Sequence, residues 1–429
     1  MSNATVRPLG YDLELISTIY ISHSKNSVLP LLVASLMVND ISIIAIDGDH
    51  IDDVRTMIDI IQHLGAHCIQ EKNRLIVDAR DLQNFDANIP ECSSTRYSLL
   101  LLGALSARLG KSKVALPGGC DLNRPFDFHI TCLEAFGNEI TVDNRSITCI
   151  QKHSPKTEFS LPYPSVGTTL QAIFSTVIGD SRLAIIIRNT ALEPEIDDVI
   201  AFLNKAGAKV FRDDSNITVI PVGRGSLSAV SHEPIHDRIE ASSYAFAAVA
   251  TRKVVLLKNC PVKLMTQALT ILEQLKCIFY IQSEHDILVD GRSIEESEPI
   301  SVVTQPYPGF PTDLQPILAA LCCTLKAVSH IRDEVMPHRT GYVKELEKIG
   351  ALISSDGNKI TIMGFESLSN AVTVNVSAPD LRGGMAIIIL AISNGCDIRI
   401  ESFNQILRGY SRIISNAHIL GGAISHEHP

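Results

Sequence analysis

The stretch LGAHCIQEKNRLIVDA, residues 64–79, places a glycine after an apolar segment and then two short apolar runs around a polar turn. The same arrangement recurs in FGNEITVDNRSITCI at Phe136, AGAKVFRDDSNITVIPV at Ala206, LKCIFYIQSEHDILVDG at Leu275, IGALISSDGNKITIMG at Ile349 and LGGAISHEHP at Leu420. A glycine follows the expected helix in five of the six copies, as a left-handed helix C-cap prefers. The pattern predicts a helix and then a β-hairpin in each copy.

Successive copies start 69 to 74 residues apart, which is too long for a solenoid repeat. Six such units, each with two helices and about four strands, predict an α/β fold. Three units a domain would give two similar domains of about 210 residues. We expect the first domain to span residues 22–232, and the second to combine residues 1–21 with 233–429, because the polar segment 230–242 suits a junction. Residues 1–21 would then return to the second domain as a closing strand.

A second landmark repeats with the same period at the expected start of one helix in each unit. The residues there are Lys25, Arg96, Gly167, Arg238, Asp313 and Arg382. Helix N-termini attract anions, and a basic side chain at that end opposes the helix dipole. The alternative is an exposed charge without a role, but four basic residues in register favour a common negatively charged ligand.

Composition excludes several classes of function. The 429-residue chain has a net charge of −10 and no basic stripe, so nucleic acid is not an expected partner. We expect neither a signal peptide nor a membrane-spanning segment, because the opening residues lack a basic head before an apolar run and no apolar run reaches about 18 residues. The ten cysteines include no C-x-x-C pair. We therefore expect a cytoplasmic protein that does not enter a membrane. The histidines at 426 and 428 lack further ligands, so we expect no metal, and no cofactor.

One cysteine stands apart, in LPGGCDLNRPFDFHI at residues 116–130. The two glycines before Cys120 predict a mobile loop. Neighbouring basic residues would lower the pKa of a thiol there and make it reactive, whereas the alternative is an inert core thiol. Basic side chains also recur through the chain and indicate a pocket for carboxylate or phosphate, which the guanidinium groups of the arginines can bind bidentately. They are Lys25, Arg96, Arg124, Arg339, Arg382 and Arg408.

The ordered motif set resembles the UDP-N-acetylglucosamine enolpyruvyl transferases, of the same superfamily as 5-enolpyruvylshikimate-3-phosphate synthase. The matching pieces run nearly end to end: SKN at Ser24, TR at Thr95, LPGGC, RPFDFH, YPSVGTT at Tyr163, EPEID at Glu193, DRIE at Asp237, FPTD at Phe310, HRTGYVKEL at His338, DLR at Asp380 and RGY at Arg408. The resemblance implies two inside-out α/β barrels of three repeats each, with the active site in the interdomain cleft.

The resemblance also implies the reaction. The enolpyruvyl group of phosphoenolpyruvate would move to the 3-hydroxyl of UDP-N-acetylglucosamine through a tetrahedral intermediate, with release of phosphate, in peptidoglycan precursor synthesis. Cys120 would be the general acid and the target of fosfomycin-type epoxides, and Asp313 the base. Phosphoenolpyruvate and phosphate would be held by Lys25, Arg96, Arg124, Arg339, Arg382 and Arg408, of which Lys25 and Arg408 would also be catalytic. The sugar nucleotide would contact Asn26, Arg124, Pro125, Phe126, Asp127, Phe128, Ser165, Val166, Gly167 and Asp313.

The chain departs from the family pattern in three places. CDLNRP spaces Cys120 and Arg124 by four residues instead of five, Phe126 and Phe128 replace aliphatic residues, and SHSKN replaces SGAKN. These differences leave two alternatives open. One is an enolpyruvyl transferase that acts on UMP or another nucleotide in a specialised pathway, such as nucleoside antibiotic synthesis. The other is an inactive nucleotide-sugar-binding homologue with a regulatory role. The oligomeric state is open.

Overall fold

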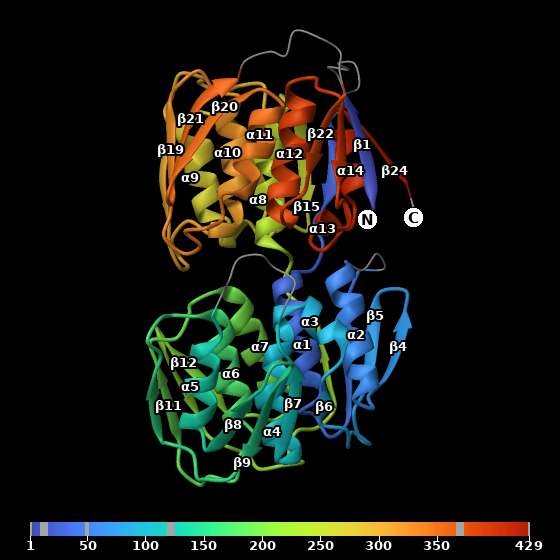
Figure 1. The fold of residues 1–429 in the computed structure, drawn as a ribbon, viewed down its shortest axis with the longest axis vertical. Coiled ribbons are helices and arrows are strands. Elements are labelled where there is room, and N and C mark those ends of the chain that lie inside the picture. The colour runs from blue at the N-terminus through green and yellow to red at the C-terminus, as the bar shows by residue number, and fades with distance from the viewer. Residues whose placement is uncertain (1, 9–15, 48–50, 118–124, 366–372, 428–429) are drawn as a thin grey trace. The chain divides into compact units, whose positions relative to one another are not determined.

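The computed structural model describes residues 2–8, 16–47, 51–117, 125–365 and 373–427. Contacts divide the chain into two compact units, one formed by Met1–Ser22 with His236–Pro429 and the other by His23–Ile235 (Figure 1). We refer to them as the discontinuous unit and the continuous unit and describe each by itself. The predicted domain boundaries, residues 22–232 and residues 1–21 with 233–429, stay a prediction.

The continuous unit has three four-stranded sheets on its outside, and each sheet carries the hairpin of one repeat at its edge. Their strand orders are β14-β3-β5-β4, β6-β7-β9-β8 and β10-β11-β13-β12. The strands are β3 (Ile41–Ala45), β4 (His67–Glu71), β5 (Arg74–Asp78), β6 (Asp86–Ala87), β7 (Lys111–Ala115), β8 (Asn138–Val142), β9 (Ser146–Gln151), β10 (Glu158–Ser160), β11 (Ile185–Arg188), β12 (Val210–Asp213), β13 (Asn216–Val219) and β14 (Val230–His232). In each sheet the first pair is parallel and the other two pairs are antiparallel.

The discontinuous unit repeats this design with the orders β2-β15-β17-β16, β18-β19-β21-β20 and β22-β23-β1-β24. Its strands are β1 (Asn3–Pro8), β2 (Ser17–Tyr20), β15 (Val254–Lys258), β16 (Ile278–Ser283), β17 (Asp286–Asp290), β18 (Ser301–Thr304), β19 (Ser329–Asp333), β20 (Ala351–Asp356), β21 (Lys359–Phe365), β22 (Val374–Ser377), β23 (Ile398–Glu401) and β24 (Gly422–Glu427). The last repeat ends after one hairpin strand, and β1 supplies the other by pairing with β23 and β24. The prediction of a returning N-terminal strand is confirmed.

Three apolar helices lie inside each ring of sheets. They are α1 (Lys25–Ser35), α4 (Leu100–Leu109) and α6 (Val166–Thr176) in one unit, and α8 (Arg238–Ala250), α10 (Gln315–Cys323) and α12 (Leu381–Ser393) in the other (Figure 1). All thirteen residues of α8 are buried, and the other five are buried over almost their whole length. A helix that is apolar all round belongs in a core. Each unit is therefore an inside-out barrel, with helices within and sheets outside.

The remaining helices are shorter or amphipathic. The longer ones are α2 (Asp52–His63), α5 (Asp127–Ala135), α7 (Pro194–Lys205), α9 (Thr266–Gln274), α11 (Gly341–Lys348) and α14 (Ile413–Ile419). Short turns are α3 (Pro90–Ser94), α13 (Asn404–Leu407) and the 3₁₀ turns η1 (Arg96–Leu99), η2 (Val262–Leu264) and η3 (Thr312–Leu314). The predicted helix starts hold within one residue, except that Arg96 and Asp313 lie in the 3₁₀ turns just before α4 and α10.

The predicted glycine C-caps all adopt the left-handed backbone that such a cap requires. The values of φ are +102° at Gly65, +88° at Gly137, +107° at Gly207, +99° at Gly350 and +94° at Gly421. The copy without glycine places Lys276 there, also left-handed at φ +54°. The hairpin that follows each helix therefore leaves it in the same way in all six copies.

Candidate active site

The predicted site residues fall in both units. Asp313, Arg339, Arg382 and Arg408 belong to the discontinuous unit, and Lys25, Asn26, Arg96, residues 125–128 and residues 165–167 belong to the continuous unit. Cys120 and Arg124 lie outside the residues that the structure describes, so the predicted loop and thiol are not part of the geometry below.

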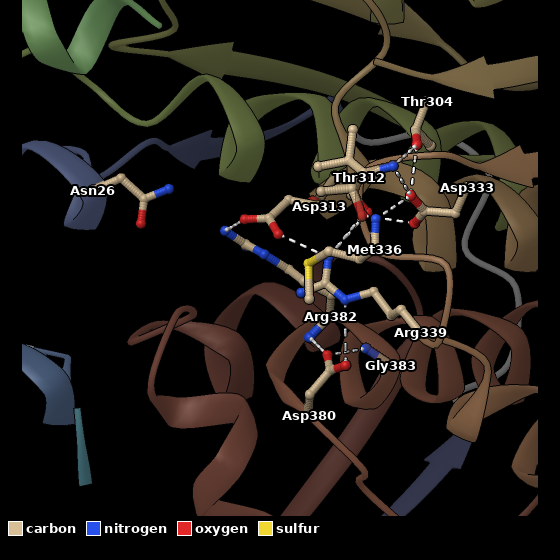
Figure 2. Close-up of polar contacts among 12 residues, drawn as sticks. Asn26, Thr304, Thr312, Asp313, Asp333, Met336, Arg339, Asp380, Arg382 and Gly383 are labelled. Carbon is tan, nitrogen blue, oxygen red and sulfur yellow. Dashed lines mark hydrogen bonds and ion pairs between the residues drawn. The ribbon is translucent and has the colours of Figure 1, made fainter. Parts of the chain in front are cut away.

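Asp313 is the centre of a charged cluster in the discontinuous unit (Figure 2). Arg339 Nη1 donates to Asp313 Oδ1 at 2.8 Å, and Arg382 Nη2 donates to Asp313 Oδ2 at 3.2 Å. The turn that carries Asp313 is itself fixed, because the hydroxyl of Thr312 donates to the buried carboxylate of Asp333 at 2.6 Å. The structure therefore brings together three of the predicted residues, because two arginines share the carboxylate of Asp313.

Asp380 holds the other side of this cluster. Its carboxylate caps the N-terminus of α12 by accepting from the backbone N–H groups of Arg382 and Gly383 at 2.7 and 3.0 Å. The same carboxylate lies 3.5 Å from Arg339 Nε. An acidic N-cap accepts from the first N–H groups of a helix and interacts favourably with the positive end of the helix dipole. This compensates for the unfavourable position of the positive charge of Arg382 near that end. Asp380 thus allows a basic residue to sit in the first turn of α12.

Both arginines are almost completely buried, with Arg339 6% and Arg382 1% exposed. Burial by itself lowers the pKa of Arg339, but the carboxylates Asp313 and Asp380 outweigh it and raise that pKa. Burial acts in the same direction on Arg382, and Tyr410 together with Asp313 raises its pKa instead. Both guanidinium groups are therefore permanent positive charges.

Arg382 retains unused hydrogen-bonding capacity. Its guanidinium lies 5.2 Å from the centre of the Tyr410 ring, and the Tyr410 hydroxyl forms a 2.9 Å hydrogen bond with Ser243. Arg382 Nε and Nη1 are buried and make no hydrogen bond within the described ranges of the chain. Because buried donors in native proteins are nearly always satisfied, these two N–H groups mark a place for an acceptor. Arg408, by contrast, follows α13 and donates to Gln405 Oε1 at 3.1 Å.

In the continuous unit, the first turn of α1 presents Lys25 and Asn26. Lys25 is 8% exposed, and its Nζ lies 3.4 Å from Asp53 Oδ2 on α2. Asn26 Oδ1 accepts from the hydroxyl of Tyr97 at 3.1 Å. Arg96 Nη2 donates to the carbonyl oxygen of Pro125, which connects η1 to residues 125–128, predicted to contact the sugar nucleotide.

The predicted nucleotide-binding residues of this unit sit at two helix starts. Phe126 precedes α5, Asp127 begins it, and Phe128 follows, with both rings half-buried. Ser165 caps α6 by accepting from the backbone N–H of Thr168 at 3.3 Å. A Cβ at Gly167 would lie 2.9 Å from His129 Nε2, so glycine lets His129 of α5 approach the start of α6 more closely than a larger residue would.

The sequence reasoning missed the partners of these residues, namely Asp53, Tyr97, Asp333 and Asp380. Only Asp380 had a readable signal, because an aspartate before an apolar helix is a typical N-cap. Tyr410 had been quoted as part of RGY but given no role. The other partners lie far away in sequence and carry no local pattern.

The cysteines that the structure describes are inert thiols. Burial raises the pKa of every one of them, to about 12 for Cys92 and about 11 for Cys149. Cys322 and Cys323 are buried in α10. In the described ranges no cluster of three or more acidic, histidine or cysteine side chains is arranged to bind a metal ion. No helix there is long and apolar enough to cross a bilayer.

Comparisons with known proteins agree with this architecture. The solved structure of the enolpyruvyl transferase NikO from Streptomyces tendae superposes with a TM-score of 0.87 over 100% of both chains at 19% identity, a likeness of fold. An EPSP synthase from Acinetobacter baumannii superposes with a TM-score of 0.73 over 100% of both chains at 13% identity.

Sequence relatives are closer. The UDP-N-acetylglucosamine 1-carboxyvinyltransferase of Kosmotoga olearia is 35% identical over 420 residues, and that of Finegoldia magna is 33% identical over 418, with 96% of both chains covered in each case. The family model for EPSP synthase (3-phosphoshikimate 1-carboxyvinyltransferase) matches residues 13–416. The chain therefore belongs to the EPSP synthase family of enolpyruvyl (1-carboxyvinyl) transferases.

Proposed function

We propose that this protein transfers the enolpyruvyl group of phosphoenolpyruvate to the 3-hydroxyl of UDP-N-acetylglucosamine and releases phosphate, a step of peptidoglycan precursor synthesis. The observation that carries the proposal is Asp313, held by two buried arginines of which one has unused donors. The 35% identity to a relative named for this acceptor supports the choice of substrate. Both substrates are metabolites of the cytoplasm, where we place the reaction.

The chemistry is an addition followed by an elimination. The sugar hydroxyl adds to C2 of phosphoenolpyruvate while C3 takes up a proton, which gives a tetrahedral intermediate. The C–O bond to phosphate then breaks and C3 loses a proton, which restores the double bond. We assign proton delivery to Cys120, which lies outside the described residues, and removal of the hydroxyl proton to Asp313.

The geometry supports Asp313 as the base. The arginine contacts described above engage both oxygens of the Asp313 carboxylate. The two arginines also hold the carboxylate in one orientation, and a positioned base contributes about 10²- to 10⁴-fold in rate.

We assign the negative groups of phosphoenolpyruvate and of the intermediate to the basic residues. Arg382 would use its Nε and Nη1, and Lys25, Arg96, Arg339 and Arg408 would add positive field, together with Arg124 outside the described residues. Pre-oriented charges of this kind stabilise a charge-rich transition state without reorganisation. Asn26, residues 125–128 and Ser165–Gly167 would hold the sugar nucleotide.

A second candidate acceptor is UMP or another nucleotide. The observation that favours it is the pair Phe126 and Phe128, whose half-buried rings flank the start of α5, in the segment assigned to the nucleotide. Aromatic rings at these two positions give the nucleotide a different surface from the aliphatic residues they replace. An inactive homologue that binds the nucleotide sugar for regulation is the remaining alternative.

The experiment is phosphate release from phosphoenolpyruvate with UDP-N-acetylglucosamine, UDP-glucose and UMP assayed in parallel. We expect turnover with UDP-N-acetylglucosamine. Release only with UMP would support the second candidate, and binding without release would support the inactive homologue.

Asp313→Asn tests the base directly. We expect kcat to fall by about 10²- to 10⁴-fold, because the amide keeps the shape but cannot take the proton. Asp356→Asn, on an exposed residue at the end of β20, is the matched control and should turn over normally. A thermal melt of each variant checks that the protein is folded. Turnover of Asp313→Asn within tenfold of the parent would rule out the base assignment.

A further inference from the structure

Three consecutive side chains in the first turn of α1 form an ion pair or hydrogen bond with three different elements. Lys25 pairs with Asp53 on α2, Asn26 accepts from Tyr97 on η1, and the hydroxyl of Ser27 donates to Asp198 on α7. Ser27 and Asp198 are 0% and 6% exposed. The backbone that carries Asn26 is therefore immobile, and only the torsions of its side chain decide where the amide points.

Tyr97 is equally well fixed. The next residue, Ser98, is fully buried, and its hydroxyl donates to the carbonyl oxygens of Cys92 and Thr95 at 2.8 and 2.7 Å. On the other side, Arg96 is bonded to Pro125. The Tyr97 ring packs half-buried against the core of the continuous unit. The phenol therefore reaches Asn26 from a rigid support, with little rotamer freedom left to lose.

This contact decides the chemistry that Asn26 offers. A side-chain amide has an acceptor oxygen at one end of a plane and two N–H donors at the other. Because Oδ1 accepts from the Tyr97 hydroxyl, the opposite end of the half-buried amide presents Nδ2. In this orientation Asn26 presents a donor, which suits an oxygen acceptor such as a sugar hydroxyl or carbonyl.

We propose that Tyr97 is a positioning and specificity-determining residue, which orients Asn26 so that its N–H groups meet an oxygen of the acceptor sugar nucleotide. This inference rests on the proposed function, since it assigns Asn26 to the acceptor. Tyr97 does not touch the reacting atoms. It acts on Asn26 through the hydrogen bond from its hydroxyl, and loss of this bond should weaken acceptor recognition without altering the chemical step.

The test removes that hydroxyl alone. Tyr97→Phe keeps the ring and its packing, so the fold is retained. We expect the KM for UDP-N-acetylglucosamine to rise about three- to tenfold, the range for one lost hydrogen bond. We expect kcat and the KM for phosphoenolpyruvate to stay within about twofold. Tyr280→Phe, on an exposed tyrosine of β16, is the matched control and should leave all three constants unchanged.

A double-mutant cycle separates positioning from a general structural effect. In an Asn26→Ala background, Tyr97→Phe should raise the dissociation constant for the nucleotide no further, because the amide that Tyr97 is proposed to orient is gone. Isothermal titration calorimetry measures this without requiring turnover. Equal effects of Tyr97→Phe in both backgrounds, or an unchanged acceptor KM in the single variant, would overturn the inference.

The proposed function is judged on the parent protein in the same experiments. A parent that turns over while Tyr97→Phe is indistinguishable from it contradicts the inference alone. A parent that binds UDP-N-acetylglucosamine without turnover contradicts the catalytic proposal, and calorimetry of the variants still decides the role of Tyr97. A parent that binds none of the three nucleotides overturns both.

Discussion

At the scale of single residues, the structure shows how strongly local backbone geometry constrains this chain. Lys276 is a lysine in a position that the other five repeats give to glycine, and its φ of +54° is left-handed. A side chain with a Cβ costs about 1–2 kcal/mol in that conformation. Its ion pairs with Glu295 and Glu298, at 4.0 and 3.6 Å, are exposed and offset little of this.

Lys276→Gly should therefore stabilise the protein by about 0.5–1 kcal/mol, since glycine avoids the left-handed penalty but has more freedom to lose on folding. Urea unfolding measures the change. Lys276→Ala is the control, because it removes the charge and keeps the Cβ, and it should give no gain. A stabilised Lys276→Ala would show that the charge, and not the backbone, is responsible.

Gly65→Ala should destabilise the protein by about 1 kcal/mol, because φ at Gly65 is +102° and an L-residue is strained there. No atom lies near enough to clash with the added Cβ, so the backbone strain is the whole cost.

At the scale of elements, α8 is a fully buried helix that contains an acidic residue. Glu240 Oε2 accepts from the backbone N–H of Ser22 at 2.8 Å, and Oε1 is buried without a hydrogen bond in the described part of the chain. Burial first, and then the charge of Asp237, raise the pKa of Glu240 to about 8. The helix therefore carries a carboxyl group that folding keeps protonated at neutral pH.

This raised pKa predicts a stability that falls as pH rises. Below the unfolded-state pKa near 4.5 the carboxyl is neutral in both states, and above that the unfolded chain ionises while the folded one holds its proton. Stability is lost progressively up to the folded-state pKa of about 8. Glu240→Gln removes this loss. The free energy of unfolding of Glu240→Gln minus that of the parent should therefore be larger at pH 8.5 than at pH 5 by at least about 1 kcal/mol.

The measurement is urea unfolding of the parent and Glu240→Gln at the two pH values. Glu347→Gln, on an exposed face of α11, is the control and should follow the parent at both. Parallel pH profiles for the parent and Glu240→Gln would contradict the prediction.

At the scale of the whole molecule, each unit has its own apolar core. The core of the continuous unit is built from residues between Val28 and Val230, and that of the discontinuous unit from Ala4, Val6, Ile19 and Ile21 together with residues from Ile239 onward. β14 closes the first sheet of the continuous unit by pairing with β3, so residues 23–235 contain every strand of their own sheets. The discontinuous unit, in contrast, depends on β1 and β2 from the N-terminus.

A fragment of residues 23–235 should therefore fold by itself and unfold cooperatively on heating. A fragment of residues 23–229 lacks β14 and leaves β3 as an unpaired edge, so it should melt at a lower temperature or aggregate. Residues 236–429 alone should not fold, because β23 and β24 lose the strand between them. Circular dichroism melts of the three fragments test this, and a folded 236–429 fragment would disprove the dependence on the N-terminal strands.

Much of the architecture can be predicted from the sequence because the residue patterns that specify it are local. Glycine caps, turn residues and alternating apolar runs lie within about 16 residues of one another in each copy, and local patterns specify local structure. Their repetition predicted the six units and the returning N-terminal strand, which pairs with β23 and β24. The ordered motifs indicated the family before any geometry was known.

The sequence by itself thus determined the repeat, the fold class and the family, and nominated the charged residues. Only the tertiary structure decided how those residues pair. Arg339 and Arg382 reach Asp313 from 26 and 69 positions away, and Tyr97 reaches Asn26 from 71. Such contacts depend on how buried helices pack against one another, and no local pattern of residues encodes that packing. The orientation of each functional group is therefore a property of the folded core.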